Sequence, residues 1–238
     1  MNQRLSSTRS AAIFISFCIF FFNLFVFDVT AQQTAAIDST VRPGSFKNQL
    51  ELFRSYPNST RDIVFLGNSI TAGVNWAELL GNPNAKNRGI SGDITFGILE
   101  RLDEVTEGKP AKIFILIGIN DIQRNHPDSV IVANYYRIVH RIKTESPSTK
   151  IYFQQLMPVN NEFTQFKNHY NKDEHIRYVN DALIELGKKE KVTIIDLHTP
   201  FMNSDGKLDK KYTSDGLHVN AAGYLLWADI LKKGNYLK

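Results

Sequence analysis

The chain has 238 residues, a formal net charge of +4 at pH 7 and a single cysteine, Cys18. This length suffices for one well-buried domain and is short for two. No basic run with interleaved aromatic residues appears, so the charge gives no reason to expect a nucleic-acid partner. A lone cysteine excludes a disulfide framework and the histidines share no metal-ligand spacing, so we expect no metal and no other cofactor.

The first segment has the layout of a secretory signal peptide. Two arginines precede an apolar run from Ala11 to Phe27, and small residues stand at Val29 and Ala31. This layout predicts a signal peptide over residues 1–31, cleavage after Ala31, and a secreted or periplasmic protein without stable membrane association. The run is also near the lower limit of about 17 residues for a membrane span, so an uncleaved anchor stays the alternative.

Short apolar runs then alternate with longer segments of helical period. We expect residues 32–60 to form an N-terminal extension with a short helix and residues 61–238 to form one domain. The expected strands begin at Asp62, Ala85, Lys112, Lys150 and Lys191, and the expected helices cover 76–80, 94–105, 129–145, 172–189 and 221–233. Such alternation is typical of an α/β fold, so we predict a five-stranded parallel sheet between two layers of helices.

Polar and glycine residues follow the expected strands. The letters GNS follow the first strand, GISGD the second, GIND the third and MPVN the fourth. In a parallel α/β sheet the ligand site lies outside the carboxyl ends of the strands. We therefore expect these segments to meet at one edge of the sheet and to form the functional site.

The stretch FLGNSITAGVNW places Ser69 directly after the first strand, between two glycines. A serine in a tight strand-to-helix turn is exposed at the sheet edge, and the first N–H groups of the following helix point toward it. Gly67 and Gly73 permit the sharp turn. Taken alone, the stretch is equally well explained as a helix cap, because Asn and Ser are common capping residues.

A second stretch, TSDGLHVNAAGY, brings Asp215 and His218 into a loop before the last helix. A serine hydroxyl is a weak nucleophile that needs a neighbouring base, and the base needs a carboxylate to orient it. A developing oxyanion also needs hydrogen-bond donors, which the Gly92 backbone and the Asn120 amide can supply. Each of these residues alone is more often a turn or surface residue.

The motifs GNSIT, NRGISGD, GIND and DGLHVN occur in this order, and together they resemble the SGNH, or GDSL-type, hydrolase family. The resemblance covers roughly residues 62–231 and implies a flavodoxin-like α/β/α sandwich that hydrolyses esters through an acyl-enzyme. It implies Ser69 as nucleophile and first oxyanion donor, Gly92 and Asn120 as further donors, His218 as base and Asp215 as its partner.

Four further side chains are candidates for substrate contact. Asn68 stands where the family usually carries an aspartate, Trp76 and Phe163 offer aromatic walls, and Arg88 offers a charge for an acidic substrate. Helix capping, core packing and an internal salt bridge are the structural explanations that stand beside these roles.

The whole set predicts a secreted serine esterase that removes short acyl groups, expected to be acetyl groups, from a small-molecule or glycan ester. Within the family, the second and fourth motifs are most similar to secreted acetylhydrolases and to carbohydrate or sialate O-acetylesterases. A lysophospholipase, a lipid esterase similar to platelet-activating-factor acetylhydrolase, or a thioesterase is the enzymatic alternative. A carbohydrate-binding module on the same scaffold is the alternative without catalysis, although a binder has no need of the whole set.

Overall fold

The computed structural model describes residues 38–238. The predicted signal peptide over residues 1–31, with its cleavage site after Ala31, lies outside the described residues. Within residues 38–238, no helix combines the length and the apolar character that crossing a bilayer requires.

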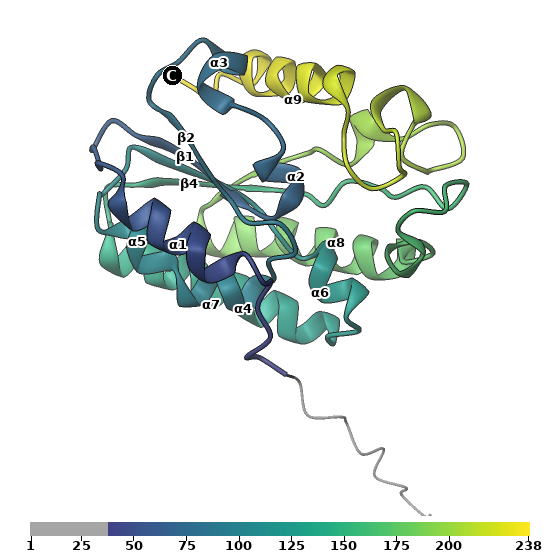
Figure 1. The fold of residues 1–238 in the computed structure, drawn as a ribbon, viewed down its shortest axis with the longest axis horizontal. Coiled ribbons are helices and arrows are strands. Elements are labelled where there is room, and N and C mark those ends of the chain that lie inside the picture. Colours follow the sequence, from purple (N-terminus) through teal and green to yellow (C-terminus); the bar gives the residue numbers. More distant parts are fainter. Residues whose placement is uncertain (1–37) are drawn as a thin grey trace, which may run out of the picture. The chain divides into compact units, whose positions relative to one another are not determined.

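A five-stranded sheet forms the centre of the domain (Figure 1). The strands are β1 (Ile63–Gly67), β2 (Ala85–Gly89), β3 (Lys112–Leu116), β4 (Lys150–Gln154) and β5 (Thr193–Ile195), in the spatial order β2-β1-β3-β4-β5. All neighbouring strands are parallel. Every residue of β1 and β3 is buried, as expected for strands that helices cover on both faces.

Helices enclose the sheet on both faces, so the predicted three-layer α/β/α fold is confirmed (Figure 1). On one face lie α3 (Trp76–Leu80) and α9 (Ala221–Lys233), and on the other lie α1 (Phe46–Ser55), α4 (Thr95–Glu100), α5 (Leu102–Thr106), α7 (Asp128–Glu145) and α8 (Asp173–Glu190). The short helices α2 (Ser69–Ala72) and α6 (Ile119–Gln123) follow β1 and β3 directly, and short 3₁₀ turns η1 (Lys167–His169), η2 (Thr199–Phe201) and η3 (Lys210–Tyr212) lie in the later loops.

One expected helix, over residues 94–105, is divided into α4 and α5 at Arg101. This residue leaves helical geometry, with φ −105° and ψ 13°. Its fully buried guanidinium donates to the Asp93 carboxylate and to the Gly67 carbonyl oxygen. The break therefore coincides with an internal ion pair that connects the helix to the end of β1.

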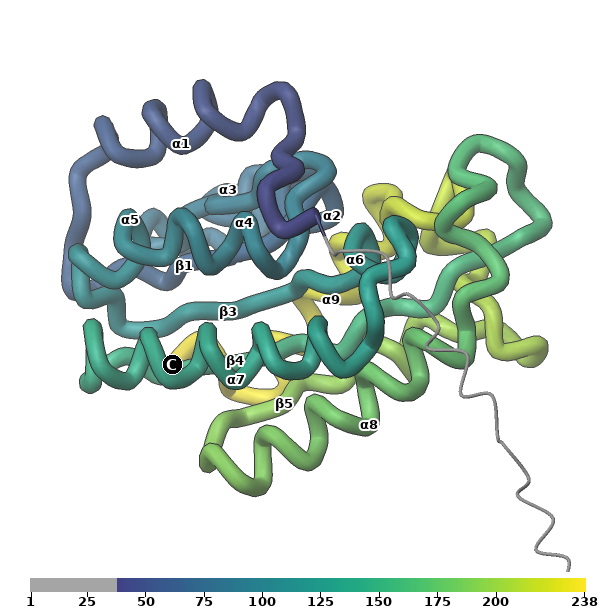
Figure 2. Tube along the Cα trace, turned by 90° about the horizontal axis from the view of Figure 1, so that it is seen from below, coloured from purple at the N-terminus to yellow at the C-terminus, as the bar shows by residue number. Residues whose placement is uncertain are grey.

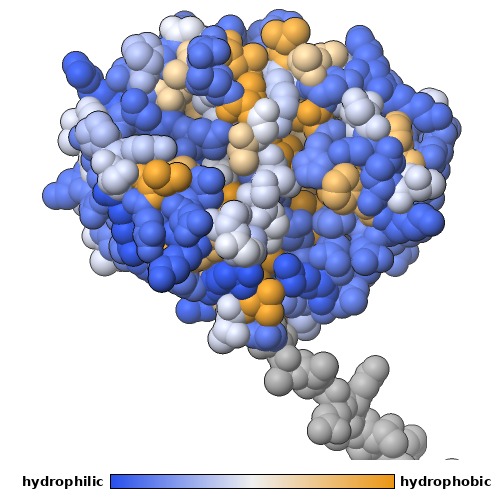
Figure 3. All heavy atoms as spheres, in the orientation of Figure 1, coloured by the Kyte–Doolittle hydropathy of each residue, from blue (hydrophilic) through white to orange (hydrophobic). Residues whose placement is uncertain are grey.

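A row of stacked aromatic rings crosses one face of the sheet. The Phe65 ring lies 3.9 Å from the Trp76 ring and 5.0 Å from the Phe114 ring, and Tyr152 continues the row at 4.6 Å from Phe114. Aromatic residues bury large areas, so this row contributes strongly to the core. Hydrophilic residues cover most of the surface seen in Figure 3, and hydrophobic residues appear there in separate patches.

The helix α1 lies within the segment expected to form an N-terminal extension. Its side chains Phe46, Leu50 and Phe53 form a small separate core cluster with Ile90, directly after β2. Pro43, just before α1, lies beside Gly92, since a Cβ at that glycine would stand 3.3 Å from the proline ring. The extension thus supports the loop that follows β2.

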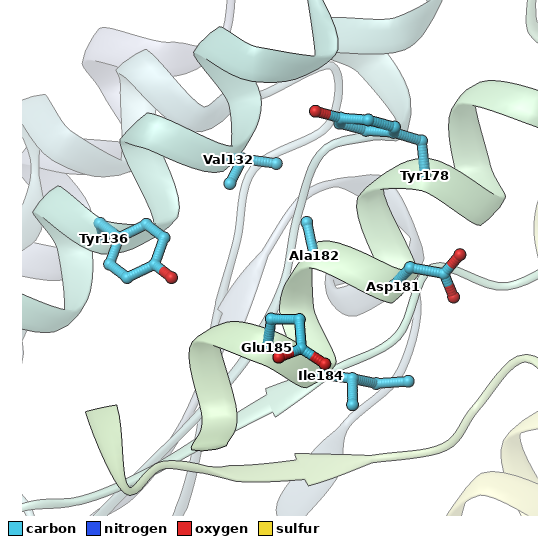
Figure 4. Close-up of a pocket in the computed structure, with 7 residues that line it drawn as sticks. All are labelled: Val132, Tyr136, Tyr178, Asp181, Ala182, Ile184 and Glu185. Carbon is cyan, nitrogen blue, oxygen red and sulfur yellow. The ribbon is translucent and has the colours of Figure 1, made fainter. Parts of the chain in front are cut away.

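The segments after β3, β4 and β5 gather at one end of the molecule, beside α2 and α6 (Figure 2). A separate hollow of about 460 Å³ lies between α7 and α8 (Figure 4). Its lining includes Val132, Tyr136, Tyr178 and Ile184, and none of the predicted site residues. The predicted site residues Ser69, Gly92 and Asn120 instead follow the carboxyl ends of β1, β2 and β3.

Candidate active site

Ser69 is the first residue of α2, directly after the tight turn that ends β1. A Cβ at Gly67 would overlap the Thr71 hydroxyl and the Leu116 carbonyl oxygen, so this turn needs a glycine. Asn68 caps the helix, because its Oδ1 accepts a hydrogen bond from the Ile70 N–H at 3.0 Å. The backbone thereby leaves Ser69 partly exposed at the sheet edge, with an N–H that has no partner inside the helix.

The structure brings Ser69, His218 and Asp215 into one hydrogen-bonded chain. Ser69 Oγ lies 2.9 Å from His218 Nε2, although 149 positions separate the two residues in sequence. On the other side of the imidazole, His218 Nδ1 lies 2.8 Å from Asp215 Oδ2. A carboxylate is an acceptor only, so Nδ1 carries the hydrogen and Nε2 is free to accept a proton from Ser69.

Hydrogen bonds from the loop itself hold the Asp215 carboxylate in place. Its Oδ1 accepts from the backbone N–H groups of Leu217 at 2.9 Å and of His218 at 2.8 Å. Partial burial alone would raise the pKa of Asp215, but these N–H donors and the His218 imidazole hold that pKa below its usual value. The carboxylate is therefore charged wherever His218 is to act as a base.

Two potential oxyanion donors stand on the loops after β2 and β3. Gly92 has φ +79°, a left-handed conformation that favours glycine, and its N–H donates to no described residue. Asn120 lies in α6 and is 7% exposed, and its Nδ2 donates one hydrogen to the Asp93 carbonyl oxygen at 2.9 Å. An amide nitrogen has two hydrogens, so the second remains for a bound group.

Buried polar contacts join these loops to α4 and to the break between α4 and α5. The fully buried pair Asp93–Arg101 has a distance of 2.9 Å between Oδ2 and Nε. Burial raises the pKa of Asp93, and the neighbouring guanidinium opposes that rise. Asp121, next to Asn120, accepts from the N–H and the hydroxyl of Thr95 at the start of α4. The donor loops are thus fixed to one another from inside the molecule.

Three of the predicted substrate contacts need correction. Trp76 is 1% exposed and stacks in the core, with its indole N–H donating to the Thr71 carbonyl oxygen. Arg88 is 4% exposed and pairs with Glu104 at 2.6 Å. Asn68 is 1% exposed and serves as the cap of α2. A side chain without exposed surface cannot reach a substrate, so these three residues support the fold.

Aromatic residues of the loop between β4 and α8 do lie at the predicted edge. Phe163 is partly buried, and a Cβ at Gly216 would stand 3.0 Å from its ring, so it packs against the loop that carries Asp215. Phe166, four positions before Tyr170, places its ring centroid 4.8 Å from that of His218. Phe163 therefore stays a prediction as a substrate contact, while Phe166 is the aromatic residue beside His218.

The sequence did not point to His169, since the histidines share no metal-ligand spacing. In the structure its Nε2 lies 3.0 Å from Asn120 Oδ1. No spacing in the sequence indicates this contact, because it joins a 3₁₀ turn of a long loop to α6, across 49 positions. Among residues 38–238, no group of three or more His, Cys, Asp and Glu side chains is arranged to hold a metal ion.

Comparisons with known proteins identify the family of the chain. The platelet-activating factor acetylhydrolase IB subunit alpha2 of Rattus norvegicus is 30% identical over 172 residues, which cover 68% of this chain and 71% of the relative. A solved structure from Streptococcus pneumonia, named for platelet activating factor, is 30% identical and superposes with a TM-score of 0.73, covering 82% of this chain and 93% of that one. A GDSL-like lipase from Bacteroides thetaiotaomicron shares the fold at 21% identity and a TM-score of 0.69, covering 79% of this chain and 96% of that one. The sequence model of the GDSL-like lipase/acylhydrolase family matches residues 65–226, and the chain belongs to this family.

Proposed function

We propose that this acylhydrolase is a serine esterase for short-chain esters, with Ser69 as the nucleophile, His218 as the base and Asp215 as the partner of the base. The observation that carries the proposal is the unbroken chain from Ser69 Oγ through His218 to Asp215, with distances of 2.9 and 2.8 Å. These distances lie within hydrogen-bond reach, which proton transfer from a nucleophile to its base requires.

Acylation uses the two nitrogens of His218 in different ways. Ser69 Oγ attacks the ester carbonyl carbon while Nε2 takes its proton, and Asp215 stabilises the resulting imidazolium. The negative charge that develops on the carbonyl oxygen is stabilised by hydrogen bonds from the Ser69 N–H, the Gly92 N–H and the free Asn120 Nδ2 hydrogen. The intermediate then expels the alcohol, which receives the proton from His218 Nε2.

Deacylation repeats these steps with water. His218 Nε2 takes a proton from the water, the oxygen of which attacks the acyl-serine, and the same donors stabilise the second oxyanion. Expulsion of Ser69 Oγ, which regains its proton from His218, releases the carboxylic acid. No group outside the described site is needed to balance either half of the reaction.

The alcohol side of the substrate is proposed to be polar, as in an O-acetylated carbohydrate. A recess of about 350 Å³ includes His169 and Phe166 in its lining, next to the base that protonates the leaving alcohol. Its other lining side chains include the amides of Gln123, Gln165 and Asn168. Amide groups beside an aromatic ring suit a ring with several hydroxyl groups better than an alkyl chain.

The acyl group is proposed to be acetyl. Relatives at 30% identity carry the name acetylhydrolase, which supports this size of acyl group. A lipid ester with an acetyl group is the second candidate, because the same relatives are named for platelet-activating factor. We also propose that the protein acts outside the cytoplasm, on the grounds of the signal-peptide layout of residues 1–31.

A panel of esters tests the reaction and its substrate. We expect the purified protein, starting at Gln32, to hydrolyse p-nitrophenyl acetate faster than the butyrate and octanoate, and to deacetylate xylo-oligosaccharides faster than an acetylated glycerophospholipid. A fluorophosphonate probe should label the wild type and leave Ser69→Ala unlabelled. A folded protein without turnover and without labelling would refute the esterase, and preference for the phospholipid would transfer the proposal to lipid esters.

The N-terminus of the protein isolated from its native cells tests the proposed location outside the cytoplasm. Mass spectrometry of protein from the periplasm or the medium should find a chain that starts near Gln32. An intact Met1 in the membrane fraction would instead support the uncleaved anchor.

A further inference from the structure

We propose that His169 is a positioning residue of this reaction: it fixes the Asn120 amide so that the second Nδ2 hydrogen points to the oxyanion. This inference deepens the proposed function and rests on it, since the orientation of Asn120 matters to catalysis only if Asn120 stabilises a transition state. His169 belongs to the 3₁₀ turn η1, in the loop between β4 and α8.

The hydrogen-bond network assigns the orientation of the amide and the tautomer of the imidazole. The Asp93 carbonyl oxygen accepts hydrogen bonds only, so the amide group facing it at 2.9 Å is Nδ2 of Asn120. The opposite end of the amide is then Oδ1, which faces His169 Nε2 at 3.0 Å. An oxygen without a hydrogen cannot donate, so Nε2 of His169 carries the hydrogen.

Two fixed contacts determine the direction of the remaining hydrogen, because an amide group is planar. One Nδ2 hydrogen is held on Asp93 and Oδ1 is held on His169, so rotation of the Asn120 side chain breaks at least one of these hydrogen bonds. A donor on Oδ1 also polarises the amide and strengthens its N–H groups as donors. His169 thus acts on the direction and on the strength of the Asn120 hydrogen bond to the oxyanion.

His169 is suited to this position because it stays neutral. Burial, the nearby His218 and the Arg124 guanidinium lower the pKa of His169 to about 4. Two other basic groups belong to the same loop: Lys167 is exposed and Lys172 is partly exposed. A neutral His169 donates its Nε2 hydrogen without adding a positive charge that would oppose the imidazolium of His218.

The turn that contains His169 is joined by a hydrogen bond to the loop that carries Asp215 and His218, so the position of His169 is defined. Tyr170, the next residue, is 5% exposed and its hydroxyl donates to the Asp215 carbonyl oxygen. The same hydroxyl accepts from the Phe166 N–H at 3.1 Å. The Phe166 ring is close to both histidines: its centroid lies 5.9 Å from that of His169 and 4.8 Å from that of His218.

A pair of substitutions separates the donor from the shape of the side chain. His169→Gln keeps an N–H group at the position of Nε2, whereas His169→Leu removes it. With p-nitrophenyl acetate, which has no sugar to fill the recess beside His169, we expect His169→Leu to lower kcat about tenfold with little change in KM. This loss is smaller than the loss of about 10²–10³ for a whole oxyanion donor. We expect His169→Gln to recover most of that loss.

A double-mutant cycle with Asn120→Ala decides whether His169 acts through Asn120. Once the amide is absent, removal of His169 should lower kcat by less than about twofold, because residues that act as a unit are not additive. A tenfold loss that recurs in the Asn120→Ala background would overturn the proposal, as would a His169→Leu variant with the wild-type kcat. His169→Ala serves as a second truncation should the leucine variant fail to fold.

Further measurements distinguish this proposal from the proposed function. Imidazole ¹⁵N chemical shifts at pH 7 should show His169 neutral, with the hydrogen on Nε2; a hydrogen on Nδ1 alone would refute the positioning role. The control is His175→Leu, which removes an exposed histidine paired with Asp128 on α7 and should leave kcat unchanged. An inactive wild type would refute the esterase itself, whereas an active wild type with an additive cycle would refute only the role of His169.

Discussion

The two halves of the candidate active site are held in different ways. The half with Ser69, Gly92 and Asn120 stands on the ends of β1 and β2 and on α6 after β3, and fully buried side chains such as Arg101 connect these ends. The half with Asp215 and His218 stands on a loop before α9, where both side chains are about a quarter exposed.

The second half depends on a neighbouring loop. Tyr170 and Phe166, from the segment between β4 and α8, contact Asp215 and His218. The sheet therefore fixes the proposed nucleophile and oxyanion donors, while contacts between loops fix the proposed base. Substitutions in the first half should show mainly as lost stability unless they touch the reacting atoms, whereas substitutions in the second half should show mainly as lost turnover.

The largest effect is expected where the two halves meet. Ser69→Ala and His218→Ala should each lower kcat by about 10⁴–10⁶, and the double variant should be hardly worse than either one, because triad members act as a unit. Steady-state kinetics with p-nitrophenyl acetate measures these losses. Losses that multiply in the double variant would show that the two halves do not work in one step.

Removal of the carboxylate should have the next largest effect. Asp215→Ala should lower kcat by about 10⁴, near the lower end of the loss for the other two residues, because an imidazole without its carboxylate still accepts a proton in a poorer orientation. Asp215→Asn keeps an oxygen that can accept from the backbone N–H groups of Leu217 and His218. The melting temperature of Asp215→Asn should therefore be closer to that of the wild type than the melting temperature of Asp215→Ala is. A kcat for Asp215→Asn near that of the wild type would contradict the role of the charge.

Arg88 tests the support of the first half. Its guanidinium pairs with the buried Glu104, so Arg88→Met leaves an unpaired carboxylate and should lower the free energy of unfolding by about 3–5 kcal/mol. Burial already raises the pKa of Glu104, with Arg88 opposing that rise, so Glu104→Gln in the same chain should restore part of the stability. Urea unfolding and KM are measured together. A raised KM at unchanged stability would return Arg88 to substrate binding.

The sequence allowed the placement of the first half at the sheet edge to be predicted. Strand order along the chain and the rule for parallel sheets place Ser69, Gly92 and Asn120 at one edge, and the structure has them on the segments that follow β1, β2 and β3. It did not reveal which polar residues are internal. The sequence is the same whether the Arg88 side chain faces solvent or pairs with Glu104, and only the three-dimensional structure shows the ion pair.

The second half was predicted only as a pair of residues. Asp215 and His218 are three positions apart, so their contact is local and readable from the sequence. The contacts of His169 and Tyr170 join a long loop to α6 and to the Asp215 loop, across 49 and 45 positions. A loop without periodicity gives no pattern from which its partners can be deduced.

Tyr170 tests how far loop contacts determine the position of the base. Tyr170→Phe removes the hydroxyl that joins the Phe166 N–H to the Asp215 carbonyl oxygen, and it leaves the ring in place. One lost hydrogen bond corresponds to about 1 kcal/mol, so kcat should fall roughly fivefold. The matched control is Tyr178→Phe, because Tyr178 is 53% exposed on α8. Equal activity of both variants would mean that the loop with Asp215 and His218 keeps its position without the Tyr170 hydroxyl.

The last expected effect is small at neutral pH and is a change in the pH dependence of stability. An unfolded histidine has a pKa of about 6.5, whereas His169 has a folded pKa of about 4. Between these values the unfolded chain binds more protons than the folded one, so this group makes the protein less stable as the pH falls from about 6.5 to about 4. Asp215, with its lowered pKa, acts in a different window, because its stabilisation is lost only as the pH falls below the usual carboxyl value.

His169→Gln should therefore flatten the curve of unfolding free energy between pH 4 and about 6.5 while leaving the acid limb below it unchanged. Urea unfolding of wild type and variant at closely spaced pH values measures this difference. Parallel curves would mean that His169 titrates alike in both states, so that it is not held neutral beside Asn120.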